Sequence, residues 1–220
     1  MNVAEELVSR MPPDARAGFA ALLAKADLAD VAISGLDLPD FVGTSLALLH
    51  RVGSRGLPLA EVAGAGETPA ARSVRDQLVA SVLLRVADGL VVRTQLGQSI
   101  ADLPDDAQPI RLWRHLAATM TNAPHEISSD GVVLLLLLLA ADSYDADYQE
   151  AISAGLAALG WRTTEGELLD KWDAFEAVVG PYRFLSHAGA VASGDGGARS
   201  ATPVGSAFAR EALRVEAPAR

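Results

Sequence analysis

The fold of this protein follows from the stretch Leu83-Leu84-Arg85-Val86-Ala87-Asp88-Gly89-Leu90-Val91-Val92-Arg93-Thr94. Two short runs rich in Leu and Val flank the Asp-Gly pair, which is a strong signal for a two-residue hairpin turn. We therefore predict a β-hairpin here. Because helical patterns surround it, the chain as a whole is predicted to be mainly α with small β-hairpins.

The residues in front of the hairpin predict three helices. The first begins at Asp40, and the second is a short helix that Pro58 opens. The third begins with Thr68 as N-cap and Pro69 at the first helical position, and apolar residues follow at helical spacing. Helix, short helix, longer helix and hairpin are thus expected in this order.

The same order of elements recurs after residue 125. The apolar run Val132–Ala141 predicts a buried core helix that Ser128 or Ser129 caps, and its ten residues are too few to span a membrane. The other expected elements are a helix over 165–179 closed by Gly180 and Pro181, a strand over 182–191, a turn at Gly194–Gly197 and a helix from Pro203.

The segment Ser45–Thr94 resembles the winged-helix domains of bacterial regulators, a variant of helix-turn-helix. It is also similar to the winged-helix dimerisation module in front of some O-methyltransferases, whose nucleotide-binding glycine motif this sequence lacks. Thr202–Arg210 resembles the strand-to-helix ending that follows many wings. At the level of fold, two such modules of acidic composition resemble the kleisin-associated winged-helix subunits of chromosome-organising complexes.

The expected architecture is two winged-helix modules plus an N-terminal helix. The expected divisions are an N-terminal helical extension at 1–39, a first winged-helix module at 40–102, a linker and connecting helix at 103–125 and a second winged-helix module at 126–220. The N-terminal helix, with Phe19, Leu22 and Leu23 on one face, is the candidate for self-association as a homodimer. Its alternative is simple packing onto the first module.

The resemblance implies DNA binding and a role in transcription regulation, and the charge pattern limits where DNA can be contacted. The formal net charge is −10, which repels DNA unless basic groups gather in one place. Residues 50–98 are locally basic. Arg72 and Arg75 near the start of the third helix, with Arg85 and Arg93 on the hairpin, are the predicted DNA-binding residues. The alternative is that they form a solvated face.

The second module favours a protein partner. Residues 99–192 carry five basic and 14 acidic groups, so phosphate repulsion makes this module a poor DNA reader. Asp170, Asp173 and Trp172 are the predicted partner-binding residues, while the alternative for Trp172 and Phe175 is a place in the core. The competing hypothesis for the chain is therefore an acidic protein-protein adaptor or dimerisation protein without DNA contact.

The sequence gives no sign of enzymatic chemistry. It has no Cys, its four His are scattered, and no serine elbow or phosphate-binding glycine loop is present. We therefore expect a non-enzymatic protein with no metal and no cofactor. Met1–Arg10 has no apolar signal region, which leads us to expect a cytoplasmic location and no membrane association.

Overall fold

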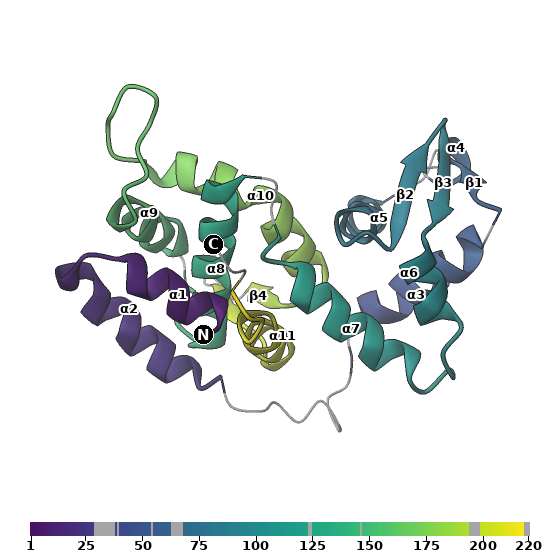
Figure 1. Cartoon of the computed structure of the whole chain (residues 1–220), viewed down its shortest axis with the longest axis horizontal. Coiled ribbons are helices and arrows are strands. Elements are labelled where there is room, and N and C mark those ends of the chain that lie inside the picture. Colours follow the sequence, from purple (N-terminus) through teal and green to yellow (C-terminus); the bar gives the residue numbers. More distant parts are fainter. Residues whose placement is uncertain are drawn as a thin grey trace.

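A computed structural model of the chain describes residues 1–28, 38, 40–53, 55–62, 68–122, 125–145, 147–193 and 199–217. The described residues are mainly helical, with two small antiparallel sheets (Figure 1). The prediction of a mainly α protein with small β-hairpins is confirmed at this level. The predicted turn at Gly194–Gly197 lies outside the described residues.

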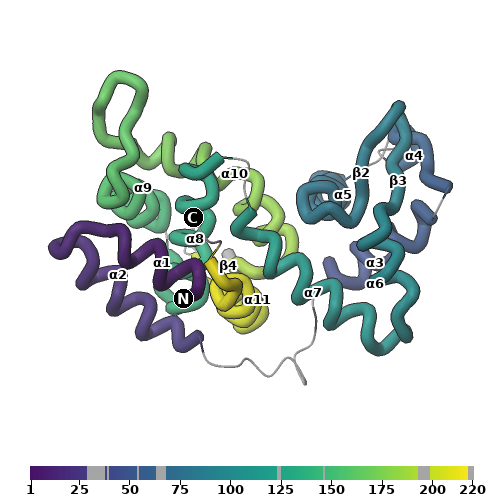
Figure 2. The backbone as a smooth tube through the Cα atoms, viewed as in Figure 1, coloured from purple at the N-terminus to yellow at the C-terminus, as the bar shows by residue number. Residues whose placement is uncertain are grey.

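The first part of the chain forms two helices. They are α1 (Val3–Arg10) and α2 (Pro13–Ala26). Helix α1 was not predicted from the sequence, although Asn2 and Glu5 form a capping box at its start. Both helices contact α8 (Glu126–Ala140) of the C-terminal half, so packing of the N-terminal helix onto the first predicted module is wrong (Figure 2).

Residues 40–101, here called the first unit, contain a complete helix and hairpin arrangement. Its elements are α3 (Asp40–Val52), β1 (Leu57–Pro58), α4 (Leu59–Val62), α5 (Pro69–Ala80), β2 (Leu84–Ala87), β3 (Leu90–Arg93) and α6 (Gln95–Ala101). Thr68 caps α5 with Pro69 at its first turn, as predicted. Asp88 and Gly89 form the turn between β2 and β3, with φ values of 51° and 74°. The predicted hairpin is therefore confirmed. The strand order is β1-β3-β2.

Residues 126–213, here called the second unit, follow the connecting helix α7 (Gln108–Thr119). The second unit consists of α8, α9 (Tyr148–Ala158), α10 (Lys171–His187), β4 (Val191–Ser193), β5 (Arg199–Ala201) and α11 (Pro203–Leu213). Helix α8 is its centre, and α9, α10 and α11 pack around it together with α1 and α2. Every residue from Val132 to Ala141 is buried, which confirms the predicted core helix.

Three local predictions in the second unit are wrong. Helix α8 begins at Glu126, with His125 as its N-cap, so Ser128 and Ser129 lie inside the helix. Helix α10 begins at Lys171 rather than at residue 165, because Asp170 and Asp173 form a capping box there. It then continues through Gly180 and Pro181 into the segment 182–187, where a strand was expected.

Burial explains why α10 continues past its proline. Phe184 and Leu185 follow Pro181 in the helix, and both are buried. A proline in a helix interior costs roughly 3 kcal/mol. Burial of two large apolar side chains stabilises by about 1.5–3 kcal/mol each, or about 3–6 kcal/mol together. Tertiary packing therefore outweighs the local signal to stop.

The two units share one hydrophobic core. Phe41 of α3, Trp113 of α7, Phe184 of α10 and Phe208 of α11 form an aromatic cluster. The Trp113 and Phe208 rings meet edge to face at 5.0 Å. This cluster joins the first unit to the second, so α7 is a packed element of the core rather than an extended linker.

The two units also repeat a detailed hydrogen-bond pattern. Thr94 and Thr202 follow the two hairpins, and each caps the next helix by accepting from a glycine N–H three residues on, at 3.1 and 3.0 Å. The backbone N–H of each threonine donates to the residue that precedes its hairpin, Leu83 or Ala190. Two distant segments thus share one local structure, which the sequence displays as Thr-x-x-Gly at 94–97 and 202–205.

Candidate functional site

The four predicted DNA-binding arginines do not form one outward-facing group. Arg72 and Arg85 are exposed. Arg93 is half-buried, and its Nη1 donates to the carbonyl oxygen of Leu49 at 3.1 Å. Arg75 is half-buried and forms an ion pair of 2.9 Å with Asp76. The structure therefore leaves Arg72 and Arg85 as the accessible members of the predicted set.

Helix α5, the predicted DNA-reading helix, has a neighbour over its outward face. Its Val74 and Leu78 are buried, so Asp76 and Ala80 lie on the opposite side. That side faces α10 across a pocket of about 410 Å³, which residues of α5, α7 and α10 line. In Figure 1, α5 is the element of the first unit that faces α10. DNA cannot reach this face of α5 unless α10 moves.

The predicted partner-binding aspartates have a structural role at the start of α10. The Asp170 side chain accepts from the backbone N–H groups of Trp172 and Asp173, at 2.7 and 2.9 Å. The Asp173 side chain accepts from the backbone N–H of Asp170 at 2.9 Å. Replacing either residue therefore removes part of the helix cap, in addition to any effect on a partner.

Trp172 is a surface residue, so the alternative that placed it in the core is wrong. It is 62% exposed, and Leu168 beside it is 64% exposed. Large apolar side chains of this exposure cost free energy in water, and such surface patches mark interaction sites. Phe175 differs from Trp172, because it is half-buried and its ring meets Tyr182 at 5.6 Å.

A groove of about 520 Å³ begins at these two exposed side chains. Its floor on α9 consists of the small residues Ser153, Ala154 and Ala157, and Leu168 and Trp172 line its other side. Small side chains on a helix allow another chain to approach closely. The groove therefore has the shape of a shallow site for a partner segment, which we name the Trp172 groove.

The Trp172 groove lies in acidic surroundings. Glu150 and Asp170 line it, and Glu165 and Glu167 are exposed on the preceding loop. Lys171 places its Nζ 5.9 Å from the centre of the Trp172 ring, in a cation-π contact. The ring thus already has a cation against it, and the surrounding field favours a basic partner.

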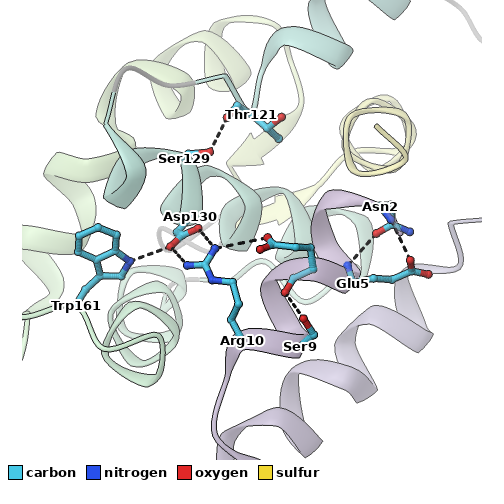
Figure 3. A network of polar contacts seen from close by, with 9 residues as sticks. Asn2, Glu5, Ser9, Arg10, Thr121, Ser129, Asp130 and Trp161 are labelled. Atoms are coloured by element: carbon cyan, nitrogen blue, oxygen red, sulfur yellow. Dashed lines mark hydrogen bonds and ion pairs between the residues drawn. The ribbon is translucent and has the colours of Figure 1, made fainter. Parts of the chain in front are cut away.

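A partly buried polar network, which was not predicted from the sequence, joins three distant segments (Figure 3). Arg10 of α1 donates from Nη1 to Oδ1 of Asp130 on α8 at 2.9 Å. Trp161 donates from Nε1 to Oδ2 of the same carboxylate at 2.9 Å. The hydrogen bond from Arg10 to Asp130 raises the pKa of Arg10. The network joins α1, α8 and the segment at Trp161, so we assign it to stability.

All three tyrosines of the chain lie together near the second hairpin. The Tyr144 and Tyr148 rings are 4.7 Å apart, and Tyr182 stacks on Tyr148 at 5.5 Å. Arg199 of β5 lies 5.7 Å from the centres of both Tyr148 and Tyr182. Burial, followed by the neighbouring phenol, raises the pKa of Tyr144 and of Tyr148. The cluster fixes the hairpin to α9 and α10.

Two histidines have structural partners. His50 contacts Gln108 at 2.8 Å, and His115 contacts the carbonyl oxygen of Ser81 at 2.8 Å. Within the described ranges, no group of three or more His, Cys, Asp or Glu side chains is placed to hold a metal ion. In the same ranges, no helix combines the length and the apolar character that crossing a membrane requires.

Comparison with known proteins gave no match. No protein-family model, no curated protein and no solved structure is similar to this chain at a significant level.

Proposed function

We propose that this protein is a non-enzymatic adaptor built from two winged-helix modules, and that it holds a basic segment of another protein in the Trp172 groove. The observation that carries the proposal is the exposure of Trp172 and Leu168, at 62% and 64%, beside a groove. Aromatic residues that stand at the edge of a pocket are the usual anchors of protein interfaces.

The element order supports the winged-helix part of the proposal. The first unit has a helix, a short strand, two helices and a hairpin, with strand order β1-β3-β2. The second unit has three helices followed by a hairpin. The repeated capping of Thr94 and Thr202 after the two hairpins supports the view that both units are variants of one module.

The chemistry of the groove supports a basic partner with an apolar anchor. The acidic side chains around it attract Lys and Arg and repel other acidic surfaces, including a second copy of this chain, whose net charge is also −10. The apolar contribution comes from Leu168 and Trp172. We expect a short amphipathic helix that places apolar residues on these side chains and basic residues toward Glu150.

The test uses a synthetic amphipathic helix with a Leu stripe flanked by Lys, titrated into the full chain by calorimetry. The double variant Leu168→Ala, Trp172→Ala should weaken binding at least tenfold, because the exposed anchors are lost. The matched control is Ile110→Ala on α7, which removes an apolar side chain that is 37% exposed away from the groove. Equal affinity of the double variant and the native chain would refute the proposal.

The charge part of the proposal needs variants that leave the α10 cap intact. Glu150, Glu165 and Glu167 are exposed, and the structure shows none of their side chains in a hydrogen bond or ion pair with a described residue. Changing all three to Gln should weaken binding and reduce its salt dependence. An unchanged salt dependence would show that the acidic surroundings do not contribute.

DNA contact is a second candidate function, which the exposure of Arg72 and Arg85 favours. Because α10 lies opposite α5, contact would involve the start of α5 and the hairpin rather than the whole helix face. In a fluorescence anisotropy titration with duplex DNA, the double variant Arg72→Ala, Arg85→Ala should weaken binding. It should also make the dependence of log affinity on log salt concentration less steep. Arg111→Ala, an exposed arginine on α7, is the control. Absence of binding by the native chain at low salt would remove this candidate.

A further inference from the structure

The pocket between α5 and α10 lies where the two units meet and is separate from the Trp172 groove. Its volume of about 410 Å³ falls in the range of small-molecule sites, which are often found between domains. Residues of α5, α7, α8 and α10 line it. Its lining is mixed, with a polar rim and an apolar floor, so it is suited to a small amphipathic molecule.

The charged groups of this pocket are mostly acidic. Asp76 of α5 and Glu176 and Arg183 of α10 line it. Asp76 already forms an ion pair of 2.9 Å with Arg75, so Glu176 is the carboxylate of this lining that we assign to a ligand. Glu176 forms no ion pair with any described residue. A carboxylate that lines a pocket without an internal partner is available to a cationic group of a ligand.

A backbone acceptor adds to the carboxylates. Pro181 lies inside α10, and proline has no N–H to donate to the carbonyl oxygen four residues before it. That carbonyl belongs to Ala177, and Ala177, Gly180 and Pro181 all line the pocket. A Cβ built on Gly180 meets no atom within 4 Å, so the space above this part of the helix is open. The turn of α10 before Pro181 thus offers an acceptor to a ligand.

The remaining residues of the pocket offer apolar and polar contacts to the rest of the ligand. Met120 and Phe184 are buried side chains that contribute to the floor. Hydroxyl and amide groups of Ser73, Gln77 and Asn122 stand at the rim. The site therefore combines several acceptors with an aromatic and a thioether surface, which suits a donor attached to an apolar group.

We propose that this pocket binds a small primary amine with an apolar or aromatic body, the ammonium lying near Glu176 and the Ala177 carbonyl. Such a ligand bridges α5 and α10 and so stabilises the two units in their present arrangement. Arg183 allows a second form of the same chemistry, in which the ligand also carries a carboxylate, as an amino acid does.

The test is a calorimetric titration of the full chain with three ligands that share one ring. 2-Phenylethylamine carries the amine, 3-phenylpropionate carries a carboxylate, and L-phenylalanine carries both. We expect 2-phenylethylamine to bind and to raise Tm, while 3-phenylpropionate does not bind. Tighter binding of L-phenylalanine that Arg183→Gln abolishes identifies an amino acid ligand, and weaker binding identifies a simple amine. Preference for 3-phenylpropionate, or no binding of either amine at 10 mM, would overturn the proposal.

Three variants locate the site. Glu176→Gln should weaken amine binding about tenfold, because a charge-assisted hydrogen bond is lost, while Glu150→Gln in the Trp172 groove should not change it. Pro181→Ala restores the N–H for the Ala177 carbonyl, so it should weaken binding although it raises Tm. Gly180→Leu should fill the open space and abolish binding in a folded chain. Unchanged affinity in all three variants would exclude this pocket.

Discussion

Arg10 and Asp130 form a two-point ion pair across 120 residues of chain, and this pair connects α1 to the core helix α8. Asp130 is buried, at 5% exposure. Trp161, which lies in a third segment, donates a hydrogen bond from Nε1 to one of the Asp130 carboxylate oxygens. This network forms only in the folded chain, because Arg10 and Trp161 reach the buried carboxylate from two distant segments.

We expect Asp130→Ala to lower the free energy of unfolding by about 3 kcal/mol, because it leaves the partly buried Arg10 and the Trp161 N–H without their acceptor. Asp130→Asn retains an acceptor and should cost less. The control is Arg214→Ala, which breaks a surface contact of 3.5 Å to Glu211 and should cost under about 1 kcal/mol. Urea unfolding measures all three, and equal effects of Asp130→Ala and Arg214→Ala would contradict the assignment.

Val82→Gly should stabilise the protein. Val82 has a φ of 61°, a left-handed conformation that is unfavourable for a β-branched residue, and its counterpart in the second unit is Gly189 with a φ of 72°. The Val82 side chain is 61% exposed, so little packing is lost. We expect a gain of about 1 kcal/mol in thermal or urea unfolding. Gly189→Val is the reciprocal change and should destabilise; a loss of stability in Val82→Gly would show that the exposed side chain matters more than the backbone.

Gly97→Ala and Gly205→Ala should each destabilise by about 2 kcal/mol or more. A Cβ on Gly97 would overlap the carbonyl oxygen of Leu83, and one on Gly205 would overlap that of Ala190. Gly43→Ala in α3 is the matched control, because its Cβ meets nothing within 4 Å and alanine favours a helix by about 1 kcal/mol. Thermal unfolding compares the three, and tolerance of alanine at both 97 and 205 would contradict the close approach.

The tyrosine cluster predicts loss of stability at alkaline pH. Burial raises the pKa of Tyr144 and Tyr148 above the ordinary value of 10.0, so the folded state keeps both phenols neutral while the unfolded state ionises them near pH 10. Their contribution is complete below that pH and is lost as the pH rises above it. Tyrosinate absorbance at 295 nm from these two residues should appear together with loss of circular dichroism. Ionisation of all three tyrosines at pH 10 in a folded chain would argue against their burial.

Trp172→Ala should leave the free energy of unfolding within about 1 kcal/mol of the native value, because its ring is 62% exposed. Trp113→Ala should cost about 3–5 kcal/mol, since Trp113 is buried in the aromatic cluster. Chemical denaturation distinguishes them. A large loss of stability in Trp172→Ala would mean that its role is in folding rather than in binding a partner.

The local elements were predictable because their signals are local. Asp88-Gly89 specifies its turn through the φ values of two adjacent residues, and Thr68-Pro69 and Pro203 mark helix starts through caps and a fixed φ. The run Val132–Ala141 predicted a buried helix because its composition leaves no polar face. The Thr-x-x-Gly repeat was also present in the sequence and was missed.

The tertiary structure decided what each side chain does. Arg93 turns to the carbonyl of Leu49, Trp172 faces solvent, and α10 continues through Pro181 toward a buried Leu185. Each outcome depends on atoms far away in the chain. Turns and caps form from hydrogen bonds among residues a few positions apart, whereas burial, ion pairing and pockets arise only when distant segments meet. The sequence alone therefore determined elements with strong local signals, such as the Asp88-Gly89 turn and the Thr68-Pro69 helix start, and the folded chain determined how far α10 extends and which side chains lie at the surface.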